Sequence, residues 1–310
     1  MTKKLKVSLI ILAYNGIDLT LDVLDCVSKL NIEGLDIETI VVDNASKDDT
    51  VRRLDAYTLS NMEFKLIKNI QNLGFAEGNN VGIKDAIKRG ADYVVLLNND
   101  ILFSEDFIHE LIKTAIKDPK IGIVSPKMYF AKGFEFHKDR YKENELGKVI
   151  WYAGGVIDRG NVYSKHRGVD EVDNGQYNVE EETDYGNGAA ILINTKLINE
   201  IGYLDKSLFL YWEDADFSQR AKSKGWKVIY TPNTFIWHKV SVAAGGPGGE
   251  TNDYFLSRNR LVFGFRYFSL RTKIALIRDS IRLLFIGRNW QKKGVVDFYL
   301  GRLGKGTKIK

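Results

Sequence analysis

The chain has few of the residues that shape disulfide-rich or low-complexity proteins. Its 310 residues include one cysteine, Cys26, and four prolines. A single cysteine allows neither a disulfide within the chain nor a cysteine metal cluster, so we expect a reducing compartment and a cytoplasmic protein. The few prolines, together with 28 glycines, exclude a collagen-like composition and disfavour a disordered chain.

Long apolar runs are also absent. No window of about 20 residues is free of charge, so the sequence predicts no membrane-spanning helix. The apolar run at residues 7–13 is too short for the core of a secretory signal, and we interpret it as a buried strand. With 44% hydrophobic residues, the chain can nevertheless bury a sizeable core.

Charge is unevenly distributed along the chain. Residues 251–310 hold 14 lysines and arginines against three acidic residues, whereas residues 1–250 hold 31 against 37. We therefore predict an acidic body at residues 1–250 and a basic helical extension at residues 251–310. A basic segment favours an anionic partner surface. We expect a phospholipid headgroup layer and no nucleic acid, because the body is acidic.

Between residues 270 and 285, apolar and basic residues recur on two helical faces about 100° apart. The apolar face holds Ile274, Ile277, Ile281 and Leu284, and the basic face holds Arg271, Arg278 and Arg282. A basic amphipathic helix can lie in the interface of an anionic membrane, which predicts a peripheral protein on the inner leaflet. The alternative is a helix packed on the body with a solvated basic face.

Apolar runs and helical patterns alternate over the first 125 residues. Strands are expected at 7–13, 38–42, 64–68, 93–97 and 121–125, and helices at 18–30, 46–57, 76–89 and 106–117. Ser46 is the expected N-cap of the second helix. The alternation predicts an α/β fold with a mostly parallel, Rossmann-like sheet flanked by helices. Ligands of such sheets bind outside the carboxyl ends of the strands.

The pattern is less regular after residue 130. Residues 130–182 are polar, with short strands expected near 149–157. Further along, the sequence predicts strands at 188–194 and 227–230, a helix at 214–224 and a basic helical segment at 252–287. The glycine-rich stretch at 242–249 is expected to be a loop that closes over the substrate.

Polar residues follow three of the expected strands. Tyr14 and Asn15 follow the first, Asp43 follows the second, and Asp100 ends the Asn-Asn-Asp sequence after the fourth. The carboxylate of Asp43 can accept hydrogen bonds from a nucleobase imide or a ribose hydroxyl. Asp100 can bind a hard divalent cation. Each segment, taken alone, is equally compatible with a turn or a helix cap.

Two further clusters carry possible chemistry. The sequence Glu213-Asp214-Ala-Asp216 opens a helix directly after Tyr211 and Trp212. Aromatic neighbours can exclude water and raise a carboxylate pKa, so that the carboxylate acts as a base. Compensation of the helix dipole is the alternative. In the second cluster His238 could join Asp100 at a metal, although a lone histidine is more often structural.

The segments together resemble glycosyltransferase family 2, and most closely its rhamnosyltransferase-like members. The matching segments follow the family's order at residues 7–16, 40–48, 72–80, 93–100, 186–193 and 202–216. The resemblance implies the GT-A fold and the cofactor Mg²⁺ or Mn²⁺. It also implies inverting transfer of one sugar from a nucleotide diphosphate donor, dTDP-L-rhamnose or a UDP-sugar, to a saccharide acceptor. We expect this acceptor to be lipid-linked and to serve cell-surface glycan synthesis.

The resemblance also implies roles for individual residues. Asp214 matches the family's general base, with Glu213 beside it, and Asp100 and His238 match its metal ligands. The implied nucleotide-sugar pocket comprises Ala13, Tyr14, Asn15, Asp43, Asn72, Asn79, Asn98, Asn99, Gly188 and Trp212.

Departures from family patterns narrow the function. Asn98 replaces the first aspartate of the metal motif, a form that the rhamnosyltransferase-like group commonly shows, and it predicts a weaker metal affinity. The Gln-x-x-Arg-Trp motif of processive members is absent, since Arg220 directly follows Gln219, which predicts single-sugar transfer. No Gly-x-Gly-x-x-Gly or Walker lysine loop follows the first strand, which disfavours a dehydrogenase or a P-loop NTPase.

The alternative function is a catalytically inert family member that binds a nucleotide sugar as a scaffold. Retention of Asp43, Asp100, Glu213 and Asp214 favours the enzyme.

Overall fold

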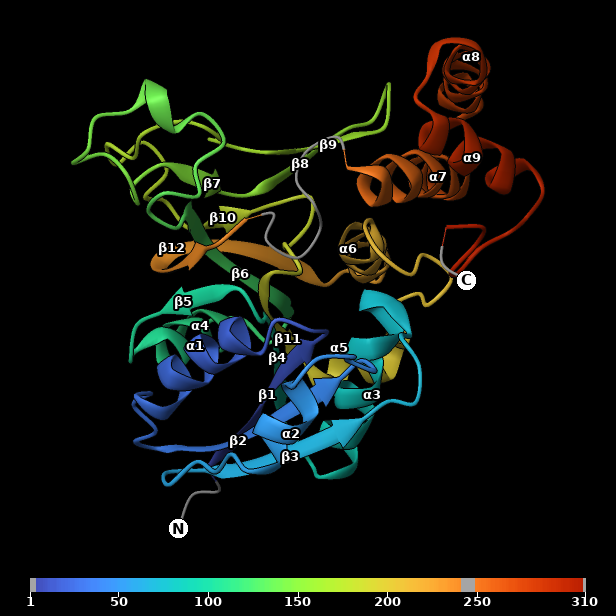
Figure 1. Ribbon diagram of the computed structural model, residues 1–310. Helices are drawn as coiled ribbons and strands as arrows, with labels where there is room; N and C mark the ends of the chain where they lie inside the picture. Colours follow the sequence, from blue (N-terminus) through green and yellow to red (C-terminus); the bar gives the residue numbers. More distant parts are fainter. Residues whose placement is uncertain (1–3, 241–248, 309–310) are drawn as a thin grey trace.

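A mixed sheet through the centre of the molecule organises the fold. The structure is a computed structural model that describes residues 4–240 and 249–308. The ten strands of the sheet follow the order β10-β12-β6-β11-β4-β1-β2-β3, with β5 added to β12 and β7 added to β6 (Figure 1). A separate two-stranded hairpin, β8–β9, lies outside this sheet.

In the main strand order, antiparallel pairs occur only on the side of β4 that holds β11, β6, β12 and β10. Parallel pairs join β1 to β2 and β4, β2 to β3, and β6 to β12, whereas β11 is antiparallel to both of its neighbours. Their bounds are β1 (Leu5–Ala13), β2 (Leu35–Asp43), β3 (Glu63–Lys68), β4 (Tyr93–Asn98), β5 (Ile101–Phe103), β6 (Ile121–Phe130), β7 (Ile150–Tyr152), β8 (Gly155–Asp158), β9 (Tyr163–His166), β10 (Glu181–Glu182), β11 (Ala190–Asn194) and β12 (Lys227–His238).

Helices cover both faces of the sheet because its central strands are apolar on both sides. On β1, Leu9 and Ile11 face the core under α1 and α4, while Ile10 faces the core under α3, α5 and α6. The helices are α1 (Ile17–Ser28), α2 (Thr50–Asp55), α3 (Gly74–Lys88), α4 (Phe107–Ala115), α5 (Thr195–Ile201), α6 (Glu213–Ser223), α7 (Glu250–Tyr267), α8 (Leu270–Ile286) and α9 (Asn289–Tyr299), with a 3₁₀ turn at Lys138–Arg140.

Several boundaries differ from the prediction: β6, for example, runs to Phe130 instead of ending at residue 125, and three other differences are informative. The second helix begins at Thr50, because the Ser46 hydroxyl accepts a hydrogen bond from the Asn15 N–H instead of capping a helix. The strand predicted at 227–230 continues to His238 as β12, after an irregularity between Thr231 and Phe235. The basic segment predicted at 252–287 is not one helix: α7 ends at Tyr267 and α8 follows. Of the predicted loop 242–249, residues 242–248 lie outside the described part.

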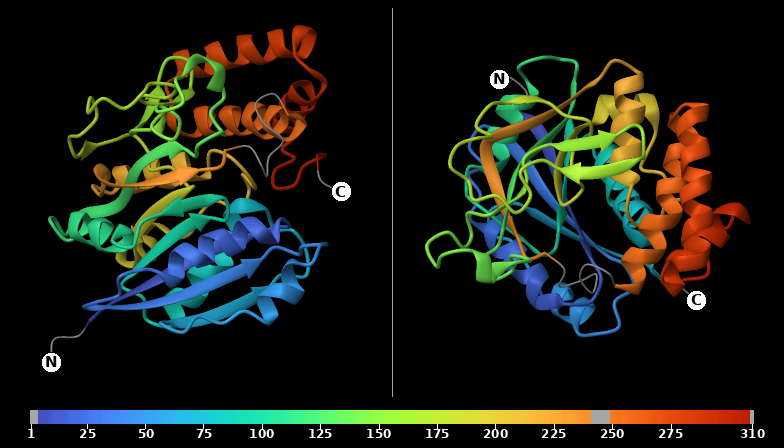
Figure 2. Two further views of the ribbon diagram at one scale, coloured as in Figure 1. Left: turned by 60° about the vertical axis from the view of Figure 1, so that its left-hand side comes forward. Right: turned by 90° about the horizontal axis from the view of Figure 1, so that it is seen from above.

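The C-terminal helices form one layer beside the sheet domain (Figures 1 and 2). The absence of a side chain at Gly264 lets α8 approach α7, since a Cβ there would lie 2.2 Å from the Leu276 side chain. The packed face of α8 holds Thr272, Leu276 and Ser280. Ile274, Ile277 and Ile281 remain exposed, so the apolar stripe predicted for this segment is not the face that packs.

The buried side chain of Arg258 fastens α7 to the rest of the chain. Its guanidinium donates hydrogen bonds to the carbonyls of Leu208 at 3.0 Å and Gly304 at 2.8 Å, and it lies over the rings of Tyr254 and Phe255. The domain boundary predicted at residue 250 stays a prediction. Through Arg258, α7 contacts Leu208 on one side of this boundary and Gly304 on the other. Within the described residues, no helix is long and apolar enough to cross a membrane.

Replacing this arginine tests whether α7 folds as part of the body. Arg258→Ala removes the hydrogen bonds to the carbonyls of residues 208 and 304 and the packing on the rings of Tyr254 and Phe255, and we expect it to lower the free energy of unfolding by about 3 kcal/mol or more. Arg271→Ala, at an exposed position of α8, should change it by about 0.5 kcal/mol at most. Urea unfolding followed by circular dichroism measures both. Equal stability of the two variants would contradict the anchoring role.

Candidate active site

Polar groups from the ends of β1 and β2 hold the two following loops together. The parallel register places Ala13 beside Asp43. Asn15 has φ 56°, and its amide oxygen accepts a hydrogen bond from the Lys47 N–H at 2.8 Å. The Asp43 carboxylate is buried and lies 3.3 Å from the Ser46 N–H. Tyr14, by contrast, is 42% exposed.

Asn44, to which the sequence assigns no role, organises the loop before α3. Its side chain is buried, donates to the Asn72 side chain and the Gly74 carbonyl, and accepts from the Asn69 side chain and the Leu73 N–H. All four bonds are 3.0–3.1 Å long. Asn44 therefore fixes Asn72 at the carboxyl edge of the sheet.

Other predicted pocket residues bond mainly within the protein. Asn79 donates to the carbonyl of Phe75, one helical turn earlier, and is buried. Asn99 donates to the Thr20 hydroxyl of α1 at 3.2 Å. The Asn98 N–H donates to the Ala189 carbonyl. These contacts set the shape of the strand ends, and a role in binding nucleotide sugar stays a prediction for each residue.

Asp100 and His238 meet although 138 residues separate them. The cause is the short strand β5, which pairs antiparallel with the end of β12 and places Ile101 beside His238. His238 Nε2 lies 2.9 Å from Asp100 Oδ1, and both side chains are buried. Two adjacent oxygen or nitrogen ligands of one octahedral cation also lie about 3 Å apart, given bonds of about 2.1 Å.

Aromatic rings orient the His238 imidazole. The ring of Trp151 lies edge-on to it, with centroids 4.3 Å apart, and His166 also packs edge-on to the same indole. His238 Nδ1 is buried and has no hydrogen-bond partner in the part of the chain described here. Burial lowers the pKa of His166 to about 4, so its imidazole stays neutral beside this pair at physiological pH.

The segment before α6 has a strained backbone. Phe209, Tyr211 and Trp212 have φ values of 65°, 67° and 74°, a region that non-glycine residues rarely adopt. The Asn259 side chain of α7 donates to the carbonyls of Leu208, Leu210 and Tyr211 at 2.8–2.9 Å. Neither sequence pattern nor resemblance indicates this residue, because an asparagine in a basic helical segment looks solvated.

Two neighbouring carboxylates, Glu213 and Asp214, follow the strained segment directly. Glu213 is buried, and its Oε2 has no hydrogen-bond partner among residues 4–240 and 249–308. Asp214 is partly exposed and accepts hydrogen bonds from the N–H groups of Gly188 at 3.1 Å and Ala215 at 2.7 Å. A Cβ at Gly188 would lie 3.2 Å from the Phe75 ring, so glycine allows this approach.

Burial raises the pKa values of both acids, but their hydrogen bonds differ. It raises the pKa of the Glu213 carboxyl well above its usual range, and the Asp214 charge raises it further. Burial also raises the pKa of Asp214, but its two N–H donors stabilise the ionised form. Glu213 is stabilised only by its own backbone N–H, and its Oε2 has no partner among the described residues, so the arrangement favours a proton on Glu213 and the negative charge on Asp214.

Tyr211 connects the acid pair to the Asp100–His238 pair. Burial, together with the nearby carboxylates of Glu213 and Asp100, raises the pKa of the Tyr211 hydroxyl to about 12. This hydroxyl donates to the Asn252 side chain of α7 at 2.5 Å. One carboxylate of each predicted pair, Glu213 and Asp100, therefore lies near enough to this phenol to affect its pKa. Trp212 is buried against Phe263, with ring centroids 4.9 Å apart, and its pocket role stays a prediction.

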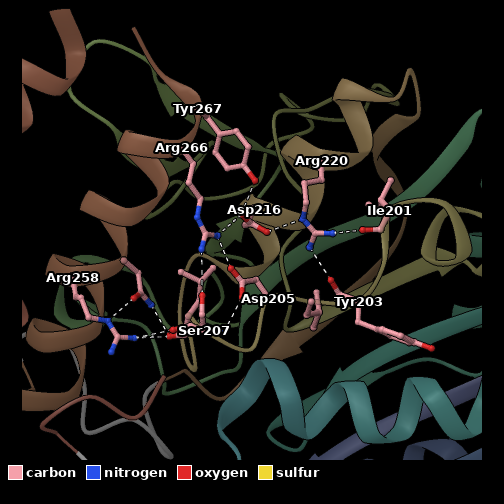
Figure 3. Close-up of polar contacts among 12 residues, drawn as sticks. Ile201, Tyr203, Asp205, Ser207, Asp216, Arg220, Arg258, Arg266 and Tyr267 are labelled. Atoms are coloured by element: carbon pink, nitrogen blue, oxygen red, sulfur yellow. Dashed lines mark hydrogen bonds and ion pairs between the residues drawn. The ribbon is translucent and has the colours of Figure 1, made fainter. Parts of the chain in front are cut away.

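The third carboxylate of the cluster is structural. Asp216 is buried and receives hydrogen bonds from Arg220 of its own helix and from Arg266 and Tyr267 at the end of α7 (Figure 3). Arg266 also pairs with Asp205. Figure 3 shows these side chains converging between α6 and α7, so Asp216 links the two helices.

Residues 8–167, just over half of the chain, match the family described as Glycosyl transferase family 2. The chain belongs to glycosyltransferase family 2. Family membership was predicted from the ordered motifs, and it is confirmed.

Three curated relatives are 20–26% identical to this chain over the aligned residues. The hexosyltransferase Agl10 of low-salt glycan biosynthesis in Haloferax volcanii is 25% identical over 60% of this chain and 53% of its own length. The poly-beta-1,6-N-acetyl-D-glucosamine synthase of Staphylococcus epidermidis is 26% identical over 77% of this chain and 51% of its own length. This chain thus spans about half the length of these two relatives. The N-acetylglucosaminyl-diphospho-decaprenol L-rhamnosyltransferase of Mycobacterium tuberculosis is 20% identical over 67% of this chain and 68% of its own length.

Solved structures of similar fold include two transferases crystallised with Mn²⁺. GalNAc-T7 with UDP, GalNAc and Mn²⁺ has a TM-score of 0.61 and 17% identity, over 90% of this chain and 55% of that one. The Pyrobaculum calidifontis mannosyltransferase PcManGT, in complex with GDP-Man and Mn²⁺, has a TM-score of 0.56 and 17% identity, over 97% of this chain and 75% of that one. At these identities the likeness shows the fold alone, and the predicted GT-A fold is confirmed.

Two substitutions in α6 should affect stability in opposite ways. Because folding raises the pKa of Glu213, the native protein loses stability as pH rises from the ordinary carboxyl pKa towards the raised one, by up to about 1.4 kcal/mol per pH unit. Glu213→Gln removes this loss, so its stability relative to the wild type should increase between pH 4 and pH 8. Denaturant unfolding at several pH values measures the difference.

The comparison variant is Asp216→Asn, which removes a buried negative charge that pairs with both Arg220 and Arg266. It should lower the free energy of unfolding by roughly 3 kcal/mol at neutral pH. A Glu213→Gln variant whose stability relative to the wild type is independent of pH would contradict the assignment of a raised pKa.

Proposed function

We propose that this chain is an inverting glycosyltransferase that moves a single sugar from a nucleotide diphosphate donor to a saccharide hydroxyl. One observation carries the proposal: the Gly188 N–H donates to Asp214, and the next residue, Ala189, accepts a hydrogen bond from Asn98 at the end of β4. The acid pair therefore lies at the strand end that leads directly to Asp100 and its partner His238. The site lies at the carboxyl ends of β1, β2 and β4, where sheets of this type bind ligands.

The donor end of the site is the group of strand-end residues around Asp43. The buried Asp43 carboxylate, beside Ala13, is the acceptor for a uracil or thymine imide, and Asn44 holds the neighbouring loop in place. We propose dTDP-L-rhamnose or a UDP-sugar as donor. A rhamnosyltransferase among the relatives supports the first of these, and the UDP in GalNAc-T7 supports the second.

Asp100 and His238 fit a divalent cation, Mg²⁺ or Mn²⁺. Their ligand atoms are 2.9 Å apart, and no cluster of three or more histidine, cysteine or acidic residues occurs in the described residues. One or two protein ligands are typical where substrate phosphates complete the coordination. The cation, when bound, would neutralise charge on the diphosphate. The Mn²⁺ in two structures of the same fold supports this choice.

Asp214 is the proposed general base. Its two N–H donors hold the carboxylate in place, and its partial exposure leaves it accessible to an acceptor. The acceptor O–H proton passes to Asp214 while the acceptor oxygen bonds to C1 of the sugar. The bond from C1 to the diphosphate oxygen breaks, and the nucleoside diphosphate leaves. Attack opposite the leaving group inverts the anomeric centre.

A lipid-linked acceptor at an anionic membrane surface completes the proposal. The acceptor named for the mycobacterial relative carries a diphospho-decaprenol group, and α8 exposes four isoleucines together with its arginines. A helix with this pattern lies in a membrane interface, on the cytoplasmic face in this proposal. Residues 251–310 would then bring the acceptor's lipid to the catalytic body.

A donor panel tests the activity. The purified protein is incubated with Mn²⁺, a lipid-linked acceptor and each of dTDP-rhamnose, UDP-glucose, UDP-galactose, UDP-GlcNAc and GDP-mannose. We expect one donor to release nucleoside diphosphate. Asp214→Asn should lower kcat about 10²- to 10⁴-fold and remove the acid limb of the pH–rate profile, because the base is gone. Absence of release from every donor would contradict the proposed function.

Metal binding has a readout that needs no activity. Mn²⁺ titration followed by electron paramagnetic resonance should give a Kd at least tenfold weaker for Asp100→Ala and His238→Ala than for the wild type. Glu105→Ala removes one exposed carboxylate near Asp100 in sequence and should bind as the wild type does. Unchanged affinity in Asp100→Ala would place the cation elsewhere.

A further inference from the structure

A cleft on the C-terminal layer lies outside the site described above. It is about 310 Å³ in volume and lies between the β8–β9 hairpin, α7 and α8. In Figures 1 and 2 the tip of this hairpin extends towards α7 and α8. The cleft is lined by Asn161, Tyr163, Arg260, Ala275, Arg278, Asp279 and Arg282.

Arg260 forms one wall of the cleft, and its guanidinium nitrogens all donate hydrogen bonds within the protein. Arg260 donates to the carbonyls of Asn161 at 2.7 Å and Val162 at 3.0 Å, and pairs with Asp279 at 2.5 Å. Its guanidinium lies 4.0 Å from the centroid of the Tyr163 ring. Because Arg260 compensates the charge of Asp279, neither residue contributes net charge to the cleft.

The other two arginines have no such partner. Arg278 and Arg282 are exposed, and no hydrogen bond or ion pair joins either side chain to residues 4–240 or 249–308. They lie four residues apart on α8, where like charges face each other and repel. A bound anion would offset this repulsion, and guanidinium groups bind phosphate oxygens in bidentate geometry.

The surface next to these arginines is apolar. Leu270, Ile274 and Phe285 of α8 are 74%, 58% and 78% exposed, and Ile277 and Ile281 also face outward. With about 100° of rotation per residue, this stripe and the pair Arg278–Arg282 occupy adjoining sides of one helix. A contiguous exposed apolar stripe indicates a partner that buries it. A free phosphate ion covers only the arginines, whereas a phospholipid covers both surfaces.

We propose that this cleft binds the phosphate group of an anionic membrane phospholipid. Arg278 and Arg282 contact the phosphate, and the stripe from Leu270 to Phe285 inserts among the acyl chains beside it. Arg260 and Tyr163 form the rigid wall against which the headgroup rests. The inference rests on the proposed membrane contact of α8 and gives that contact a defined headgroup site.

Vesicle sedimentation tests the site without any catalytic step. The full chain is mixed with vesicles of phosphatidylcholine alone or with 30% phosphatidylglycerol, at physiological salt. We expect the wild type to sediment with the anionic vesicles. Arg278→Gln/Arg282→Gln should bind them about 30-fold more weakly, because each arginine near an anionic surface strengthens binding about fivefold. Lys196→Gln/Lys224→Gln removes the same charge from two exposed lysines on other elements and should bind as the wild type does.

Three results would overturn the proposal. The arginine variant could bind anionic vesicles as tightly as the wild type, the lysine variant could lose as much affinity as the arginine variant, or the wild type could sediment only after polyprenyl diphosphate is added. The last result would assign the arginines to the lipid-linked acceptor. Glycosyl transfer to a soluble acceptor, measured on the same variants, distinguishes a failure of this site from a failure of the proposed activity: both variants should retain it.

Discussion

The site depends on hydrogen bonds from α7 to the strained segment that precedes α6. Three residues of this segment have positive φ values, each of which costs on the order of 1–3 kcal/mol. Asn259 donates to three of its carbonyls and Arg258 donates to that of Leu208, which holds the backbone in this form. Because Glu213 and Asp214 follow directly, their positions relative to the sheet depend on a helix from the basic extension.

This dependence changes how the C-terminal extension is understood. A membrane anchor attached to an independent catalytic body needs no contact with the catalytic residues. Here α7 supports the acid pair through Asn259, links to α6 through Asp216, and leads directly into α8 with its exposed apolar stripe. The proposed membrane surface on α8 and the proposed general base are thus linked through two consecutive helices, α7 and α8, and membrane contact of α8 would orient the acceptor side of the site relative to the bilayer.

Sequence patterns predicted what depends on local periodicity. The strands at the centre of the sheet are apolar on both faces, so β1, β2 and β4 were placed within a few residues. Long-range polar contacts were not predictable. Ser46 has the composition of an N-cap, yet its hydroxyl bonds to Asn15, 31 residues away. No periodicity indicates β5, whose three residues gain stability only by pairing with the end of β12.

The resemblance supplied the candidate residues, and the structure supplied their arrangement. Asp100 and His238 come within 2.9 Å, and Asp214 accepts a hydrogen bond from the Gly188 N–H, whereas Asn259 has no motif that would identify it. The central claim is single displacement at C1 with Asp214 as base. The anomeric configuration of the first product, determined by ¹H NMR before mutarotation or further transfer, tests it directly. The account predicts a linkage of opposite configuration to the donor, and a product that retains the donor's configuration would contradict it.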